Sequence, residues 1–124
     1  MSYRSEVFAV LQRYKEGFDE YDDEKVRDCF VWPCTALVNG NTITLTDPPV
    51  TIADMQKQKN WHRSINWEID VIAASSTKAH VALRNVERLR PDGSLIECAS
   101  GFYALIKTEE GWKIFAFSAI DFPA

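Results

Sequence analysis

Hydrophobic residues recur every three or four positions near the start of the chain. Val7, Leu11, Tyr14 and Phe18 follow this spacing, and charged residues occupy many of the positions between them. In a helix, such spacing gathers the apolar side chains on one face. The pattern therefore predicts a long amphipathic helix from Tyr3 to Glu20, whose apolar face can cover a core.

Capping signals predict two shorter helices. One of the two aspartates at positions 22 and 23 can cap a helix from Glu24 to Phe30, and Pro33 prevents its continuation. Thr51 and Asp54 resemble a capping pair that opens a third helix ending near Trp61. All three predicted helices thus lie in the first half of the chain, and the first two form a hairpin.

Alternating apolar and polar residues predict six strands. The dipeptide Asn39-Gly40 favours a tight type I′ turn, which makes its two flanking segments a hairpin. A meander of longer strands follows the third helix. In chain order the predicted strands are Cys34–Val38, Asn41–Thr46, Trp67–Ala74, Lys78–Arg90, Leu95–Lys107 and Trp112–Asp121. The sequence therefore predicts an α+β fold with a largely antiparallel sheet.

The turn lengths indicate which residues of the last three strands lie opposite one another. A two-residue turn at Asp92-Gly93 pairs Glu87 with Cys98 and Leu83 with Phe102. A three-residue turn ending at Gly111 then pairs Phe102 with Ser118. We expect this face to be the concave one, apolar with a polar island of Asn85, Glu87, Cys98, Ser100 and Ser118.

The opposite face of the same strands is also apolar. It carries Tyr103, Phe115 and Phe117, with Arg84 among them. Three helices can cover only one face of a sheet, and an exposed apolar face usually marks an interface. We therefore expect a homodimer in which this second, convex face contacts another copy of the chain.

Composition narrows the possible functions. A length of 124 residues with 46% hydrophobic residues suits one domain, which we expect to span residues 1–124. The formal net charge of -4 argues against a nucleic-acid partner, which would need clustered basic residues. No apolar run approaches the ~20 residues of a membrane-spanning helix, and no signal-peptide pattern is present, so we expect a cytoplasmic protein.

The three cysteines add little chemistry. Cys29, Cys34 and Cys98 form no CxxC pair, and in a reducing cytosol they would remain thiols. Neither a metal site nor a disulfide is predicted from them. No motif indicates a cofactor, so any reaction is expected to be cofactor-free.

The order of elements and the closing strand Gly111-Trp112-Lys113-Ile114 resemble the nuclear transport factor 2-like superfamily, which includes SnoaL-like polyketide cyclases and ketosteroid isomerases. The resemblance spans nearly the whole chain. It implies a cone-shaped, cystatin-like sheet whose concave face is closed by the helices, with a ligand pocket between them. It also implies frequent dimerisation through the convex side.

Ketosteroid isomerase offers the nearest local similarity. Its first helix has a stretch like Gln12-Arg13-Tyr14, and the resemblance implies that Tyr14 donates a hydrogen bond to an oxyanion. However, Val38 and Phe102 stand where that family keeps its two acids, so steroid isomerisation is not implied. The acidic and histidine patterns of scytalone dehydratase and limonene epoxide hydrolase are not in a recognisable place either.

Two further residues are candidates for acid–base chemistry. In the expected register Glu87 points into an apolar cavity, where desolvation would raise its pKa towards a useful range. The alternative is a carboxylate at the rim that pairs with Arg88 or Arg90. His62 lies where this fold has its pocket mouth and could be a general base, or it could be an ordinary surface histidine.

The remaining candidates would bind rather than react. Trp32 and Trp67 offer flat aromatic walls, and the others offer hydrogen bonds or apolar contact: Asn85, Cys98, Ser100, Phe102 and Ser118. The sequence thus predicts a SnoaL-like protein that binds a small, partly apolar organic molecule, with a cofactor-free lyase, isomerase or cyclase as one interpretation. A non-catalytic ligand-binding or dimerisation module of the same fold is the other.

Overall fold

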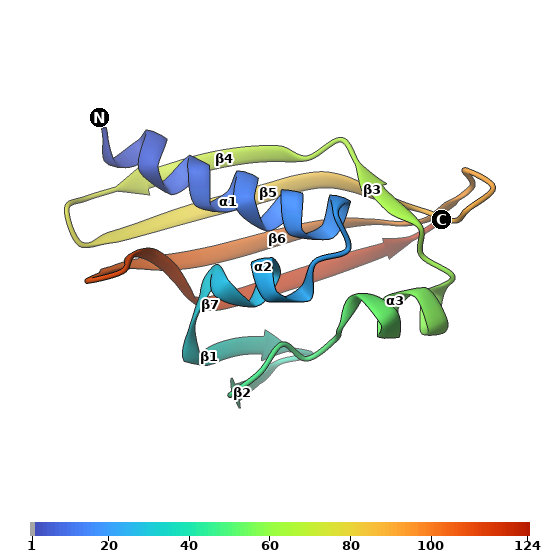
Figure 1. Cartoon of the computed structure of the whole chain (residues 1–124), viewed down its shortest axis with the longest axis horizontal. Helices are drawn as coiled ribbons and strands as arrows, with labels where there is room; N and C mark the ends of the chain where they lie inside the picture. Colours follow the sequence, from blue (N-terminus) through green and yellow to red (C-terminus); the bar gives the residue numbers. More distant parts are fainter. Residues whose placement is uncertain (1) are drawn as a thin grey trace.

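A computed structural model describes residues 2–124. These residues form three helices, α1 (Tyr3–Asp19), α2 (Asp23–Asp28) and α3 (Ile52–Lys59), and seven strands (Figure 1). The strands are β1 (Phe30–Val38), β2 (Asn41–Leu45), β3 (Arg63–Ile65), β4 (Glu68–Ala74), β5 (Lys78–Leu89), β6 (Leu95–Thr108) and β7 (Gly111–Pro123). The element order is the predicted one, with β3 as an added short strand.

Local capping explains where the helices begin and end. The side chain of Asp22 accepts a hydrogen bond from the backbone of Lys25, so the first of the two candidate aspartates caps α2. Thr51 and Asp54 form a complete capping box at the start of α3. Asn60 ends that helix in the left-handed conformation. Within residues 2–124 no helix is both long and apolar enough to cross a bilayer.

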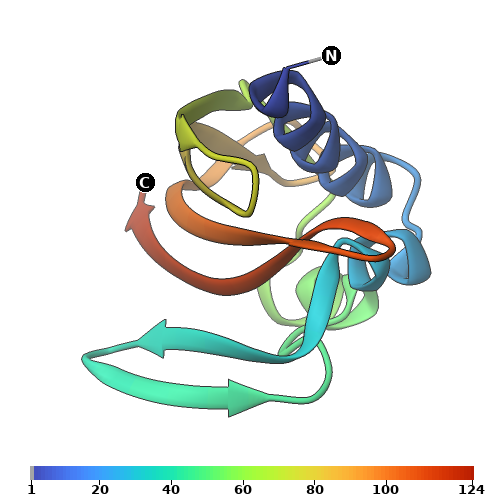
Figure 2. The same ribbon diagram turned by 90° about the vertical axis from the view of Figure 1, so that its left-hand side faces the viewer.

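The strands form one curved sheet in the order β2-β1-β7-β6-β5-β3, and β4 also pairs with β5. Every pair is antiparallel except β1 with β7, which is parallel. Figure 2 shows that the sheet curls without closing, that the helices cover its concave side, and that the β1–β2 hairpin extends away from the body. The predicted α+β architecture is confirmed.

A β-bulge in β5 changes the predicted register. Glu87 pairs with Cys98 as predicted, but Leu83 pairs with Gly101 instead of Phe102. Three residue steps from Leu83 to Val86 lie opposite two steps on β6, and Asn85 in the bulge has a φ of 58°. An extra residue reverses the alternation of side chains along a strand. Leu83 and Val86 therefore both face the helices.

The turn between β6 and β7 also differs from the prediction. Thr108 pairs with Gly111, so the turn has two residues and not three. A bulge at Phe115 compensates, because the pairing shifts between Ala104 and Leu105. Phe102 consequently lies opposite Ser118, as predicted, but a two-residue turn and a bulge produce this pairing instead of a three-residue turn.

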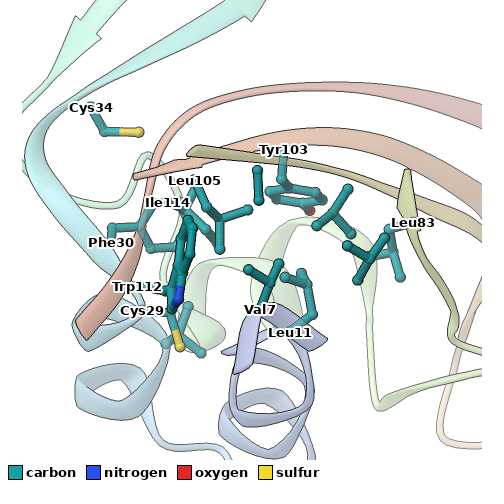
Figure 3. Close-up of a cluster of buried hydrophobic side chains, with 14 of the residues drawn as sticks. Val7, Leu11, Cys29, Phe30, Cys34, Leu83, Tyr103, Leu105, Trp112 and Ile114 are labelled. Carbon is teal, nitrogen blue, oxygen red and sulfur yellow. The ribbon is translucent and has the colours of Figure 1, made fainter. Parts of the chain in front are cut away.

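The helices cover the face that we expected to be convex. Val7 and Leu11 of α1 are fully buried and point towards Tyr103, Leu105 and other residues of the sheet (Figure 3). Phe102 and Ile106 alternate with these residues on β6 and are 42% and 39% exposed. Because β5 to β7 are apolar on both faces, the alternation alone did not say which face meets the helices. On β6, and on β5 beyond the bulge, the concave and convex faces are therefore the reverse of those expected, whereas Leu83 faces the helices as expected.

The close packing of α1 on α2 depends on Gly17. A Cβ atom at this position would lie 2.6 Å from Cγ2 of Val26 and 3.0 Å from its backbone nitrogen. A change from glycine to alanine inside a helix normally stabilises a protein by about 1 kcal/mol. We expect the opposite for Gly17→Ala, a loss of about 1–3 kcal/mol through overpacking.

Urea denaturation monitored by circular dichroism measures this change. Gln12→Ala, at an exposed position of the same helix, is the control and should leave the free energy of unfolding nearly unchanged. Equal or greater stability of Gly17→Ala would contradict the packing described here.

Candidate functional site

A cavity lies between α1, α3 and the concave face of the sheet. It consists of two adjoining hollows of about 70 and 230 Å³. Six residues line both hollows and mark the passage between them: Tyr14, Phe18, Met55, Arg88, Tyr103 and Ala119. The space suits a small organic molecule, and these six residues come from two helices, α1 and α3, and from three strands, β5, β6 and β7.

Most of the cavity wall is apolar and aromatic. Trp67, Leu83 and Val86 line the smaller hollow, and Phe30, Trp32 and Phe117 are among the residues that line the larger one. The ring of Tyr14 makes edge contacts with four other aromatic rings, at centroid distances of 5.1–6.1 Å. Such contacts hold each ring in a defined orientation. The wall is thus a set of fixed flat surfaces.

Two tyrosine hydroxyls form the first polar feature of the cavity. The hydroxyl of Tyr103 donates to that of Tyr14, with an oxygen–oxygen distance of 3.4 Å. Burial raises the pKa of Tyr14 well above its ordinary value and also raises the pKa of Tyr103. Both hydroxyls therefore stay protonated at neutral pH. Within residues 2–124, the proton of Tyr14 has no recorded acceptor, so it is available to a ligand.

An arginine between two carboxylates forms the second polar feature. Nη1 of Arg88 lies 2.5 Å from Oε2 of Glu97 and 3.0 Å from Oδ1 of Asp121. Nζ of Lys59, the last residue of α3, lies 2.6 Å from the same Glu97 oxygen and 3.6 Å from Oδ2 of Asp121. The four side chains join α3 to β5, β6 and β7. Two positive and two negative charges balance in this network.

The network keeps its members charged despite their burial. Burial by itself would lower the pKa of Arg88, but the hydrogen bond to Glu97 and the charge of Asp121 raise it. Burial by itself would raise the pKa of Glu97, yet the hydrogen bonds from Lys59 and Arg88 lower it. A buried charge is tolerated only when it is paired in this way.

Four of the predicted site residues line the cavity. Tyr14 is at its centre, Trp67 and Ser100 belong to the smaller hollow, and Trp32 belongs to the larger one. Ser100 alternates with the inward Ala99 and Gly101 and pairs with Ile120, so its side chain is on the outer face, contrary to the expectation that it binds a ligand. The indole nitrogens of the two tryptophans donate to backbone oxygens, those of Arg27 and Ser64, which fixes the rings. Both tryptophan rings therefore have fixed positions in the cavity wall.

Five of the predicted site residues lie on the outer face of the sheet instead. The amide of Asn85 donates to the carboxylate of Glu68, the first residue of β4. The carboxylate of Glu87 accepts from the amide of Asn66, just before β4. Cys98, Phe102 and Ser118 share this face, because they pair with Glu87 or with one another. The expectation that Glu87 points into the cavity is therefore wrong, because the bulge at Asn85 reverses the alternation of side chains between Leu83 and Glu87.

His62 belongs to a separate surface groove with Tyr21, Lys15 and Asp19. Its ring nitrogen Nδ1 lies 3.3 Å from the hydroxyl of Tyr21, and its side chain is exposed. The structure does not bring His62 together with Tyr14.

The residues predicted for the convex face divide into two groups. Arg84 and Phe115 do lie outside, where Arg84 pairs with Asp70 and Lys78 covers the ring of Phe115. Tyr103 and Phe117 face the cavity and are stacked on each other at 6.3 Å. Their predicted role in a dimer contact is incompatible with this position.

Sequence reasoning missed Arg88, Glu97, Asp121 and Tyr103 as parts of the site. Glu97, Asp121 and Tyr103 lie on the inner face of β6 and β7, whereas the expected register puts Tyr103 on the convex face and gives no role to Glu97 or Asp121. The sequence held one signal for the inward position of Arg88. Asn85 is a residue type that tolerates positive φ, and its presence inside a strand is compatible with a bulge. Residues 2–124 contain no cluster of three or more metal-ligating side chains.

The charge network makes a testable contribution to stability. Glu97→Gln removes a buried negative charge that accepts from Arg88 and Lys59, so we expect a loss of about 2 kcal/mol at pH 7. The lowered pKa of Glu97 means that its contribution is complete above its ordinary value of 4.5 and is lost as the pH falls through the folded-state value. The difference in free energy of unfolding between the wild type and Glu97→Gln should therefore shrink from pH 7 towards pH 3.

Denaturation curves at several pH values measure this difference. Glu109→Gln, in the exposed turn before β7, is the matched control and should have a small effect at every pH. A gap for Glu97→Gln that stays constant down to pH 3 would contradict the charged state of Glu97.

Comparison with known proteins agrees with this architecture. A structure from Novosphingobium aromaticivorans, described as a candidate aromatic ring hydroxylase, is 20% identical with a TM-score of 0.65, covering 97% of this chain and 88% of its own. An NTF-2 like protein of Shewanella oneidensis is 15% identical with a TM-score of 0.73, covering 94% and 97%. A candidate dehydratase of the NTF2-like family from Streptomyces avermitilis is 14% identical with a TM-score of 0.65, covering 97% and 96%.

These identities are too low to transfer a function, and they show the fold alone. No curated protein matches the chain. A family model described as NTF2-like protein (DUF6841) matches residues 5–121. Since that match covers most of the chain, the protein belongs to this NTF2-like family.

Proposed function

We propose that the cavity binds a small, partly apolar organic molecule that carries a carbonyl group, and that Tyr14 donates a hydrogen bond to the carbonyl oxygen. The observation that carries this proposal is the free proton of the Tyr14 hydroxyl, which is held inside an aromatic wall. A buried donor without an acceptor gains from a ligand that supplies one. The Tyr103 hydroxyl strengthens this donor by donating to the Tyr14 oxygen.

Asp121 is the residue that we propose as the base of a cofactor-free proton transfer. It lines the larger hollow together with Tyr14, and its side chain is 42% exposed. In the proposed step the carboxylate takes a proton from the carbon next to the carbonyl group. The C–H electron pair forms the new carbon–carbon double bond, and the π pair of the carbonyl group moves to the oxygen, where the hydrogen bond from Tyr14 stabilises the enolate. Isomerases, dehydratases and cyclases of this type begin with such a step.

A binding protein without catalysis is the second candidate. Its support is the engagement of Asp121, whose two oxygens already interact with Arg88 and Lys59. A carboxylate held by two cations is a weaker base than a free one. The names of the compared structures, a hydroxylase candidate and a dehydratase candidate, concern those proteins and favour neither option at their low identity.

A simple ketone separates the two candidates. With 2-acetonaphthone in D₂O, loss of the methyl proton signal measures proton abstraction, and the shifts of the protein signals measure binding. We expect Tyr14→Phe to weaken binding about tenfold, the equivalent of one good hydrogen bond. Asp121→Asn should retain binding and abolish the accelerated exchange.

Tyr21→Phe is the control, because Tyr21 is exposed and lies outside the cavity. Binding without accelerated exchange in the wild type would support the non-catalytic module. Failure of 2-acetonaphthone to bind, or equal binding by Tyr14→Phe, would refute the role of Tyr14.

The outer face of the sheet is the surface that we propose for homodimer formation. Four large apolar side chains on β6 and β7 are between 39% and 60% exposed there: Phe102, Ile106, Ile120 and Phe122. Charges of both signs flank them, including the ion pair between Arg84 and Asp70. In a dimer with a two-fold axis, the positive groups of this border can face the negative groups of the same border in the other copy. The residues of this proposed contact replace Tyr103 and Phe117, which face inward.

Phe102→Glu tests the proposed dimer. A charge at the centre of the apolar face should shift the protein from dimer to monomer in sedimentation-velocity experiments. Phe8→Glu is the matched control, because Phe8 is also exposed but lies on α1. A wild-type protein that sediments as a monomer at all concentrations would contradict the proposal.

A further inference from the structure

The guanidinium group of Arg88 has hydrogen-bonding capacity that the protein does not use. Both of its recorded hydrogen bonds start from Nη1, one to Glu97 and one to Asp121. Within residues 2–124, Nε and Nη2 have no recorded acceptor. Within residues 2–124, Nε1 of Trp112 is the only fully buried side-chain nitrogen or oxygen without a hydrogen-bond partner. Nε and Nη2 of Arg88 have no partner, so they are not fully buried.

The unused donors belong to the cavity. Arg88 lines both hollows, and its side chain is 22% exposed. It extends from β5 beyond the bulge, on the same face as Val86. An arginine that lines an apolar cavity and has unpaired N–H groups gains from a ligand that supplies an acceptor.

The acceptors near Arg88 are already engaged. Oε2 of Glu97 accepts from both Arg88 and Lys59, and Asp121 has one oxygen near each of these cations. Two unengaged polar groups in this part of the cavity, the hydroxyl of Tyr14 and the guanidinium edge of Arg88, are donors, and the amide of Gln58 can also donate. A ligand that offers acceptors fits this arrangement, and a ligand ammonium group does not.

We propose that the natural ligand carries a carboxylate group, which Nε and Nη2 of Arg88 bind. This proposal rests on the ligand site proposed above. The planar guanidinium edge presents two parallel N–H groups that match the two oxygens of a carboxylate. Glu97 is a positioning residue, because it is buried and holds Nη1, which leaves the edge formed by Nε and Nη2 free to bind a ligand. The substrate class is thus a small aromatic or other flat organic acid.

The charge of the network favours a single negative charge. Arg88 and Lys59 balance Glu97 and Asp121, so the site has no excess of positive charge to hold a doubly charged phosphate. A carboxylate still gains charge-assisted hydrogen bonds from the unused donors. The nearby carboxylate of Asp121 opposes the ligand charge and limits its affinity.

Two probes of equal shape test the proposal. 2-Naphthoate and 2-naphthamide share the same rings and differ in charge, and isothermal titration calorimetry at pH 7 measures the binding of each. We expect 2-naphthoate to bind about tenfold more tightly, which corresponds to one charge-assisted hydrogen-bond pair. Arg88→Met should remove this preference and leave the two affinities equal.

Arg84→Met is the matched control. Arg84 lies on the same strand, is exposed on the outer face and pairs with Asp70, so its loss should not alter the preference. Circular dichroism reports whether each variant folds. Because Arg88→Met removes a member of the charge network, a second variant is needed that keeps Arg88.

Asp121→Asn provides that second variant. It removes the negative charge next to the proposed carboxylate position and retains a polar side chain of equal size. We expect 2-naphthoate to bind several-fold more tightly and 2-naphthamide to bind as before, an increase on the order of fivefold for one removed like charge. Asp70→Asn, on the outer face, is its control and should change neither affinity.

The outcomes distinguish this proposal from the proposed function on which it rests. If neither probe binds the wild-type protein, the ligand site itself is refuted. If both bind equally well, or if Asp121→Asn leaves the affinity for 2-naphthoate unchanged, the carboxylate proposal is overturned and the ligand site stands. A preference for 2-naphthoate that Arg88→Met abolishes and Asp121→Asn increases supports it.

Discussion

One extra residue in β5 determines which side chains reach the cavity. Before the bulge at Arg84 and Asn85, the inward positions of the strand carry apolar residues such as Leu83. After it, Val86 and Arg88 face inward. Without the bulge, the alternation from Leu83 would have continued through Asn85 and Glu87, and the charged group in the cavity would have been a carboxylate. The sign of the charge in the site thus follows from a backbone irregularity.

The inward position of Arg88 in turn requires nearby negative charge. A guanidinium group in an apolar wall is costly unless carboxylates neutralise it. Glu97 and Asp121 satisfy this need from the two neighbouring strands, and Lys59 balances the second negative charge from the end of α3. This helix is therefore anchored to the sheet by the same ions that make the site polar. The stability of the fold and the proposed recognition of a ligand thus depend on one network.

The cavity is left with a surplus of hydrogen-bond donors. The tyrosine pair supplies one free hydroxyl proton, and the arginine supplies the unused edge of its guanidinium group. The walls around them are aromatic and held by edge contacts. A flat molecule with an acceptor at one end and a second acceptor elsewhere is complementary to these features. This complementarity is the physical content of both functional proposals.

The sequence by itself determined the three helices, six of the seven strands, their order and the family architecture, because capping residues, turn dipeptides and hydrophobic periodicity act over a few neighbouring positions. It also identified Tyr14, Trp32 and Trp67 as cavity residues. The tertiary structure decided the rest. Strands that are apolar on both faces do not reveal which face the helices cover, and the bulge in β5 reverses the alternation partway along the strand. For that reason Glu87 lies outside, and Arg88, only one position further along the chain, lies within the site.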